Sequence, residues 1–142
     1  MLTTNQKGAI AETAIAHEAI KLGIGVYRPL ADERADFIFD LGSRLVRVQC
    51  KWATRYDDVI VARLYGARRT ATGLRRIFYS AEEIDAFAIY CDGECYFIGI
   101  DEVAGRSQLL LRLGDTRNSQ RAGINWARDF RFAAKLGGLS GP

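Results

Sequence analysis

The residues whose types and spacing suit catalysis lie within the stretch 34–52. This stretch reads as two short apolar strands joined by a turn. Asp36 stands at the start of the first strand. Gln49 and Lys51 stand near the end of the second, where the alternation of strand side chains turns both toward one face. An acidic residue thus lies next to a Gln-x-Lys pair beside an apolar sheet, a combination that suits a metal ion and a phosphate group.

A helix before this stretch carries a further acidic residue. Thr3 or Thr4 is suited to cap the helix, Gln6 is spaced to complete a capping box with Thr3, and the helix is expected to end near Leu22. At about 100° per residue, Glu12 falls on the small, apolar face of this helix. A carboxylate there is costly unless it has a partner. Two partners stay open, a salt bridge to Lys or Arg and a metal ion, and the metal ion is favoured because a strand-start acid and a lysine follow.

The other elements follow from apolar runs and turn residues. The predicted strands cover 25–28, 34–40, 45–52, 59–64, 85–91 and 94–100. The third of the site's strands is assigned to 59–64, and 65–76 is expected to be a flexible basic loop. Asp92-Gly93 is typical of a hairpin turn. A C-terminal helix completes an α/β fold with a mixed central sheet flanked by helices.

Length and composition limit the classes of protein. A chain of 142 residues, 49% of them apolar, is long enough for one domain with a core. We expect a single domain over 1–142, with the basic segment 106–136 as part of it and 137–142 frayed. No apolar run approaches the ~18–20 residues of a membrane span, so no membrane partner is expected. Three cysteines without a Cys-x-x-Cys pair predict a reduced, cytoplasmic chain without a zinc site. The single histidine, His17, disfavours histidine-dependent hydrolysis.

Basic residues are gathered in two blocks. The net charge is only +3, yet residues 44–76 hold nine Lys or Arg against two acids, and 106–142 hold seven against two. The intervening residues 77–105 hold seven acids and no Lys or Arg. Sixteen of the twenty basic residues are arginine, whose planar fork matches phosphate oxygens and guanine edges. This pattern favours a nucleic-acid partner over a merely solvated basic surface. The residues expected to contact DNA are Lys7, Arg55, Arg68, Arg69, Arg75, Arg76, Arg117, Asn118, Gln120 and Arg121.

These patterns together resemble a known family. Lys7-Gly8-Ala9-x-Ala11-Glu12, Pro29 followed by Asp36, and Val48-Gln49-Cys50-Lys51 resemble the PD-(D/E)xK nucleases. The likeness is closest to their small Gln-x-Lys branch, that of bacterial group I intron-encoded homing endonucleases. A weaker likeness continues through Tyr79-x-x-x-x-Ile84-Asp85-x-Phe87-Ala88 to the stretch Asn118-Ser119-Gln120. The sequence departs from the commonest pattern at Gln49, where Asp or Glu usually stands.

The resemblance implies a restriction endonuclease-like core and hydrolysis of DNA phosphodiester bonds with Mg²⁺, for which Mn²⁺ can substitute. Glu12, Asp36, Gln49 and the backbone carbonyl of Cys50 would hold the metal ion, since Mg²⁺ prefers oxygen ligands. Lys51 would position the attacking water or stabilise the developing charge. With two carboxylates, a one-metal mechanism or a weakly held second ion is favoured over a rigid two-metal site.

The function predicted from the sequence is that of a homing-endonuclease-like enzyme that acts on double-stranded DNA. Cutting both strands generally calls for two active sites, so a homodimer or homotetramer is expected. The alternatives are a Holliday junction resolvase or repair nuclease, and a non-catalytic DNA-binding protein on a nuclease scaffold.

Overall fold

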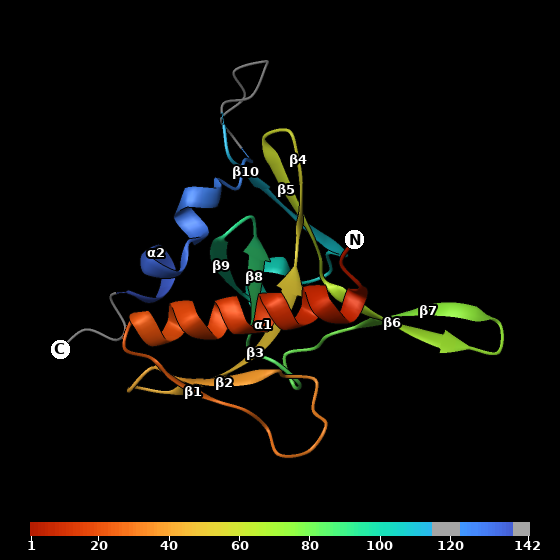
Figure 1. The fold of residues 1–142 in the computed structure, drawn as a ribbon, viewed down its shortest axis with the longest axis horizontal. Coiled ribbons are helices and arrows are strands. Elements are labelled where there is room, and N and C mark those ends of the chain that lie inside the picture. Colours follow the sequence, from red (N-terminus) through yellow and green to blue (C-terminus); the bar gives the residue numbers. More distant parts are fainter. Residues whose placement is uncertain (115–122, 138–142) are drawn as a thin grey trace.

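A mixed five-stranded sheet forms the centre of the molecule, with the long helix α1 lying across one of its faces (Figure 1). The computed structural model describes residues 1–114 and 123–137. The strands of this central sheet follow the order β1-β2-β3-β8-β9, and only the β3–β8 pair is parallel. In chain order the elements are α1 (Thr4–Lys21), β1 (Gly25–Tyr27), β2 (Phe37–Asp40), β3 (Leu45–Trp52), β4 (Thr54–Tyr56), β5 (Val59–Arg63), β6 (Tyr65–Thr70), β7 (Gly73–Phe78), β8 (Ala86–Cys91), β9 (Glu94–Gly99), the 3-10 helix η1 (Ile100–Val103), β10 (Gln108–Arg112), the 3-10 helix η2 (Ala127–Phe130) and α2 (Phe132–Leu136). The predicted mixed α/β fold is confirmed.

Helix α1 begins at the predicted capping box. Thr3 Oγ1 accepts a hydrogen bond from the Gln6 amide at 3.1 Å, and Gln6 Oε1 accepts one from the Thr3 amide at 2.9 Å, so two free backbone donors are satisfied. Ala11, Ile15 and Ala19 are buried, four residues apart along one stripe. Small side chains on this stripe let the helix pack close to β3 and β8.

The two faces of the central sheet bury separate apolar clusters. Helices α1 and α2 cover one face, where Phe39, Val48 and Phe132 belong to one cluster. The opposite face packs against a second sheet of order β10-β5-β4, and Phe87 and Leu111 belong to that cluster. Strands β8 and β9 contribute side chains to both clusters, because successive residues of a strand point to opposite faces of the sheet.

The prediction that 59–64 is a third strand of the site's sheet is wrong. Val59–Arg63 is a strand, β5, but it pairs with β4 and β10 in the second sheet. The strand that actually pairs with β3 on its other side is β8, in parallel register from Val48↔Ala86 to Trp52↔Tyr90. An apolar strand pattern shows that a segment pairs but leaves its partner open, and here the buried parallel position goes to the more apolar β8.

The basic stretch expected to be a flexible loop is a regular β-hairpin. Strands β6 and β7 pair with each other in a separate two-stranded sheet and project away from the rest of the molecule (Figure 1). Their register runs from Tyr65↔Phe78 at the base to Thr70↔Gly73 at the tip, where Gly73 adopts a positive φ of 124°. We call residues 65–78 the basic hairpin.

The strand predicted over 34–40 begins only at Phe37, and the other predicted strands lie within one residue of their predicted bounds. β8 and β9 form a hairpin whose turn residues, Asp92 and Gly93, have φ values of 48° and 87°. The C-terminal helix is split into η2 and α2, with Ala127 and Phe132 buried. Among the described residues, no helix is long and apolar enough to cross a membrane. The predictions for 138–142 lie outside the described residues.

Candidate active site

Asp36 completes the ladder between β2 and β3 with its side chain. The Asp36 amide donates to the Val48 carbonyl at 2.8 Å, one residue before β2 begins. The Cys50 amide, the next donor of β3 on that side, donates instead to Asp36 Oδ2, also at 2.8 Å. The carboxylate is thus fixed at the point where β2 is absent and the β3 edge is open. The same alternation places the Cys50 carbonyl on this open side.

The surroundings of Asp36 disfavour the ionised form of its carboxyl group. Burial is the largest influence and raises the pKa of the Asp36 carboxyl, and the negative charge of Glu12 raises it further. The hydrogen bond from the Cys50 amide and the charges of Lys51 and Arg28 act in the opposite direction. Within the described residues Oδ1 of Asp36 accepts no hydrogen bond. A cation placed between the Asp36 and Glu12 carboxylates would relieve this repulsion.

Glu12 has the salt-bridge partner that the sequence left open. Arg28 Nη1 lies 3.3 Å from Glu12 Oε1, and the guanidinium of Arg28 stacks 5.1 Å from the Phe37 ring centroid. The Glu12 side chain is 28% exposed and that of Arg28 66% exposed. Such a solvent-exposed pair is worth about 0–1 kcal/mol, so it leaves Glu12 able to exchange Arg28 for a metal ion.

Gln49 and the Cys50 carbonyl lie together beside Asp36. Gln49 Nε2 donates to the Cys50 carbonyl at 3.2 Å, and its Oε1 accepts no hydrogen bond from the described residues. The two neutral oxygens and the two carboxylates make an all-oxygen set, which fits a hard divalent cation. No group of three or more His, Cys, Asp or Glu residues that could hold a metal ion occurs in 1–114 and 123–137. The neutral oxygens are therefore needed for any metal site here.

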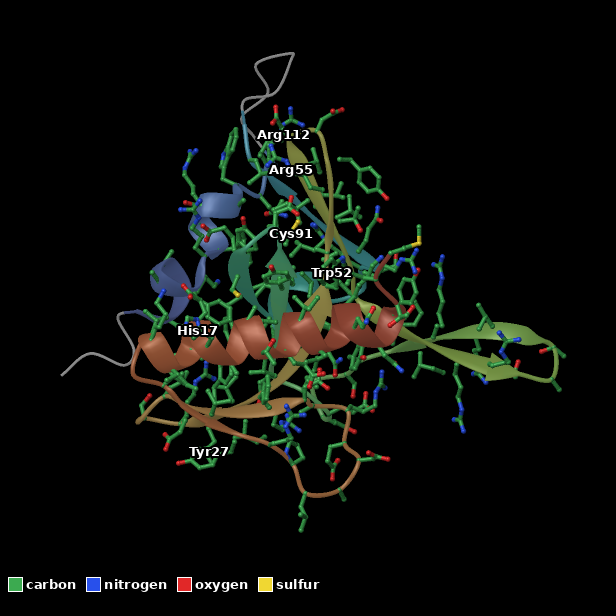
Figure 2. The ribbon with its side chains drawn as sticks, in the orientation of Figure 1. His17, Tyr27, Trp52, Arg55, Cys91 and Arg112 are labelled. Carbon is green, nitrogen blue, oxygen red and sulfur yellow. The ribbon has the colours of Figure 1, made fainter. Side chains whose placement is uncertain are left out.

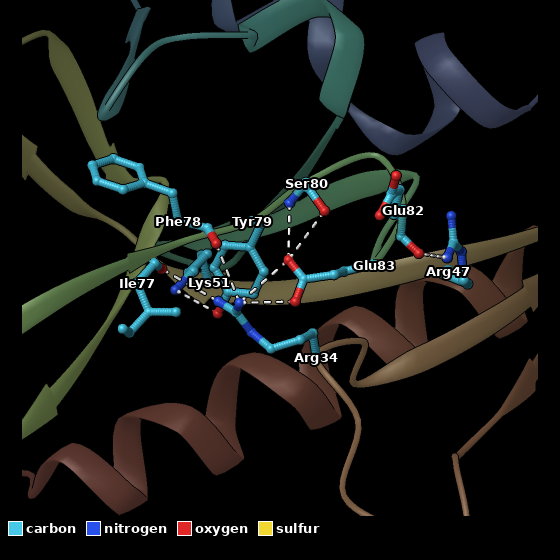
Figure 3. A network of polar contacts seen from close by, with 9 residues as sticks. All are labelled: Arg34, Arg47, Lys51, Ile77, Phe78, Tyr79, Ser80, Glu82 and Glu83. Atoms are coloured by element: carbon cyan, nitrogen blue, oxygen red, sulfur yellow. Dashed lines mark hydrogen bonds and ion pairs between the residues drawn. The ribbon is translucent and has the colours of Figure 1, made fainter.

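Lys51 extends from β3 to the base of the basic hairpin. Its Nζ donates to the Tyr65 carbonyl at 2.9 Å. It also donates to Tyr79 Oη at 3.4 Å (Figure 3). Burial lowers the pKa of Lys51 to about 8, helped by the positive charge of Arg34 and opposed by the negative charge of Asp36. An ammonium with this environment suits a role beside a phosphate, whose negative charge would offset the burial.

Arg34 and Tyr79 were not among the predicted site residues. Arg34 Nη1 donates to the Phe78 carbonyl at 3.2 Å and to Glu83 Oε2 at 3.1 Å, and Nη2 donates to the Ile77 carbonyl at 3.3 Å (Figure 3). Its Cζ lies 3.8 Å from the Tyr79 ring centroid. The only sequence signals were the position of Arg34 two residues before Asp36 and the place of Tyr79 in the weaker part of the family pattern.

The predicted DNA-contact residues are divided among several places. Arg68, Arg69, Arg75 and Arg76 are all exposed on the basic hairpin, where Arg68 faces Arg75 directly across the two strands. Like charges in this position repel each other, so the pairing of Arg68 with Arg75 lowers the stability of the hairpin.

Lys7 and Arg55 lie elsewhere. Lys7 Nζ lies 5.9 Å from the Trp52 ring centroid, at the end of β3. Arg55 is near Arg112 in the second sheet, apart from the hairpin, and its guanidinium lies 3.7 Å from Asp58 (Figure 2). Arg117, Asn118, Gln120 and Arg121 lie outside the described residues.

Comparisons with known proteins identify the class. The family model of the PD-(D/E)XK endonucleases matches residues 2–133, and the chain therefore belongs to this family. Among solved structures, that of the bacterial homing endonuclease I-Ssp6803I is similar, with a TM-score of 0.75 and 25% sequence identity over 93% of this chain and 90% of the other. No curated protein matches. The predicted resemblance is confirmed, and the fold and family support a nuclease.

Proposed function

We propose that this chain is a Mg²⁺-dependent endodeoxyribonuclease of the homing-endonuclease type. One observation carries the proposal. The open edge of β3 gathers a fixed acid, Asp36, two neutral oxygens on Gln49 and Cys50, and the ammonium of Lys51. This is the chemistry that phosphodiester hydrolysis needs, and it occurs in a chain of a nuclease family.

In this proposal Asp36, Glu12, Gln49 and the Cys50 carbonyl hold the metal ion. When bound, Mg²⁺ polarises a phosphoryl oxygen and lowers the pKa of a water, and Mn²⁺ can serve in its place. The amide of Cys50 keeps Asp36 Oδ2 in place and leaves Oδ1 available. Two carboxylates favour one firmly held ion.

Lys51 acts on the substrate in this scheme. Its Nζ, held at the Tyr65 carbonyl, orients a water or stabilises the negative charge that develops on the scissile phosphate. Ionic attraction between Lys51 and Asp36 keeps the ammonium near the metal site, since each charge shifts the pKa of the other toward its ionised form.

The proposed substrate is double-stranded DNA, bound in part by the basic hairpin. Its four exposed arginines match phosphate oxygens and guanine edges. The similar solved structure is that of a homing endonuclease, which favours duplex cleavage over junction resolution. A homodimer or homotetramer supplies the two active sites that duplex cleavage calls for. A cytoplasmic location fits the three free, buried cysteines.

The test is cleavage of supercoiled plasmid, linear duplex and a four-way junction with Mg²⁺ or with chelator. We expect the wild-type protein to nick or linearise plasmid only with Mg²⁺. Lys51→Ala should lose cleavage and keep its affinity for DNA. Lys21→Ala is the matched control, because Lys21 is exposed and forms its ion pair with Glu18 on the same helix. Undiminished cleavage by Lys51→Ala refutes the assignment of Lys51. Cleavage confined to junctions identifies a resolvase, and binding without cleavage identifies a non-catalytic protein.

A further inference from the structure

The base of the basic hairpin is attached to the candidate active site on both of its strands. On β6, the Tyr65 carbonyl accepts from Lys51 Nζ at 2.9 Å. On β7, the Ile77 carbonyl accepts from Arg34 Nη2 at 3.3 Å, and the Phe78 carbonyl that follows accepts from Arg34 Nη1. Tyr65 is paired with Phe78 across the hairpin, so Lys51 and Arg34 bind the two residues of one cross-strand pair.

Tyr79 lies between these two attachments. Lys51 Nζ is 4.9 Å and Arg34 Cζ is 3.8 Å from the centroid of its ring, and the phenol oxygen accepts from Lys51 at 3.4 Å (Figure 3). The ring itself packs edge-on against buried Phe87 of β8, with centroids 5.5 Å apart at 89°. Tyr79 therefore links the end of β7 to the core of the central sheet.

We propose that Arg34 and Tyr79 are positioning residues: they fasten the base of the basic hairpin beside the site, so that the element carrying four clustered arginines also fixes the orientation of the Lys51 ammonium. This inference rests on the proposed nuclease function and deepens it. It assigns to Arg34 and Tyr79 an action through Lys51 and not on the substrate.

The chemistry of lysine explains why such a device is needed. A lysine ammonium is a compact charge on a flexible four-carbon stem with three donors. Tyr65 and Tyr79 occupy two of the Lys51 donors, which leaves the third for a phosphate or water. A two-stranded hairpin is at best marginally stable alone, and Arg68 facing Arg75 weakens this one further. Without Arg34 and Tyr79, both the hairpin and the ammonium would lose their fixed positions.

The test compares Arg34→Gln and Tyr79→Phe with Arg47→Gln as matched control. Arg47 resembles Arg34 because it binds an acid, Asp85, and two backbone carbonyls in the turn at 81–82, whereas its hydrogen bonds within the described residues reach neither the hairpin nor Lys51. Its side chain is 36% exposed, against 29% for Arg34. All variants are first checked for folding by circular dichroism. If Arg34→Gln does not fold, Tyr79→Phe still tests the inference, because this variant keeps the aromatic ring.

Two readouts separate positioning from general damage. Single-turnover cleavage at saturating duplex should fall about ten- to a hundredfold in Arg34→Gln and about fivefold in Tyr79→Phe, and because the duplex is saturating this loss does not come from weaker DNA binding by a loosened hairpin. The Hε/Cε resonance of Lys51, one of only four lysines, should shift in both variants as it loses its contacts. Arg47→Gln should change neither.

The outcomes decide the inference independently of the proposed function. Wild-type rates and an unmoved Lys51 resonance in Arg34→Gln and Tyr79→Phe refute it, as does an equal loss of cleavage in Arg47→Gln. If the wild-type protein does not cleave DNA at all, the proposed function fails. The Lys51 resonance then still tests the positioning contacts: a shift in both variants supports them, and no shift refutes them.

Discussion

Replacing Lys51 with methionine should stabilise the metal-free protein at pH 7 while ending cleavage. Lys51 is held ionised in a partly buried position that lowers its pKa to about 8 from an ordinary 10.5. Methionine keeps an unbranched apolar stem and removes the charge. A residue that lowers the stability of the folded protein is expected where that residue serves a function.

The magnitude follows from the change in pKa. A lowering of 2.5 units (10.5 minus about 8) at ~1.4 kcal/mol per unit costs about 3 kcal/mol at pH 7. Loss of the two hydrogen bonds, to Tyr65 and Tyr79, offsets about 2 kcal/mol of the gain. The variant should therefore be more stable by about 1 kcal/mol at pH 7, with screening by water at the partly exposed ammonium acting to reduce the gain.

The sign of this difference should reverse in alkaline solution. Between pH 8 and pH 10.5 the unfolded chain binds more protons at Lys51 than the folded chain does, so the stability of the wild-type protein rises with pH in this window. At about pH 10, most of the free-energy cost of burying the Lys51 ammonium is gone. The variant still lacks the two hydrogen bonds to Tyr65 and Tyr79. Lys51→Met should then be less stable than wild type by about 1 kcal/mol.

Urea denaturation in chelator, followed by tryptophan fluorescence at pH 7 and pH 10, measures both differences. Groups that the Lys51 charge does not influence titrate equally in the two proteins and cancel in the comparison. Lys21→Met, at a 60% exposed site, is the control for losing a lysine charge. Equal destabilisation of Lys51→Met at both pH values would contradict this prediction, because it would show that burial of the Lys51 ammonium has no free-energy cost.

Other predictions concern the metal site, the hairpin and the core. Asp36→Asn should end cleavage without lowering the unfolding free energy in chelator at pH 7, because burial and Glu12 raise the pKa of Asp36 and wild-type stability falls as pH rises through that pKa. Urea melts at several pH values measure this. Gln49→Glu should tighten Mg²⁺ binding in calorimetry, because a third carboxylate joins the site. Arg68→Ala with Arg75→Ala should lower the slope of log affinity for duplex against log salt by about 2, one for each lost phosphate contact, without lowering the melting temperature. Phe39→Ala should cost about 3–5 kcal/mol in urea melts, because this ring is fully buried.

The sequence predicted best the elements whose signals are local. The capping box of α1, the strands on either side of Gly42 and the Asp92-Gly93 hairpin each depend on residues close together in the chain. The sequence did not reveal which strands pair with β5, because pairing between strands far apart in the chain leaves no sign in a single apolar run. The basic hairpin was read as a loop because its strands carry arginines, glycine and alanine where strands usually carry branched residues.

The same division holds for the site. Asp36, Gln49 and Lys51 could be predicted as site residues because they lie close together in the chain, and the alternation of strand side chains turns Gln49 and Lys51 toward one face. Arg34 was missed because its partners, Ile77, Phe78 and Glu83, lie 43 to 49 residues away. The salt bridge from Arg28 to Glu12 also spans two elements, so the sequence could only state that Glu12 needs a partner.

The most direct test of the proposed metal site is a crystal structure of the protein soaked with Mn²⁺, located by its anomalous scattering. We expect one ion bound by Asp36 Oδ1 and by at least one oxygen of Gln49 or the Cys50 carbonyl, with Glu12 released from Arg28 toward the ion. An ion bound elsewhere, or none near Asp36 at saturating Mn²⁺, would contradict it.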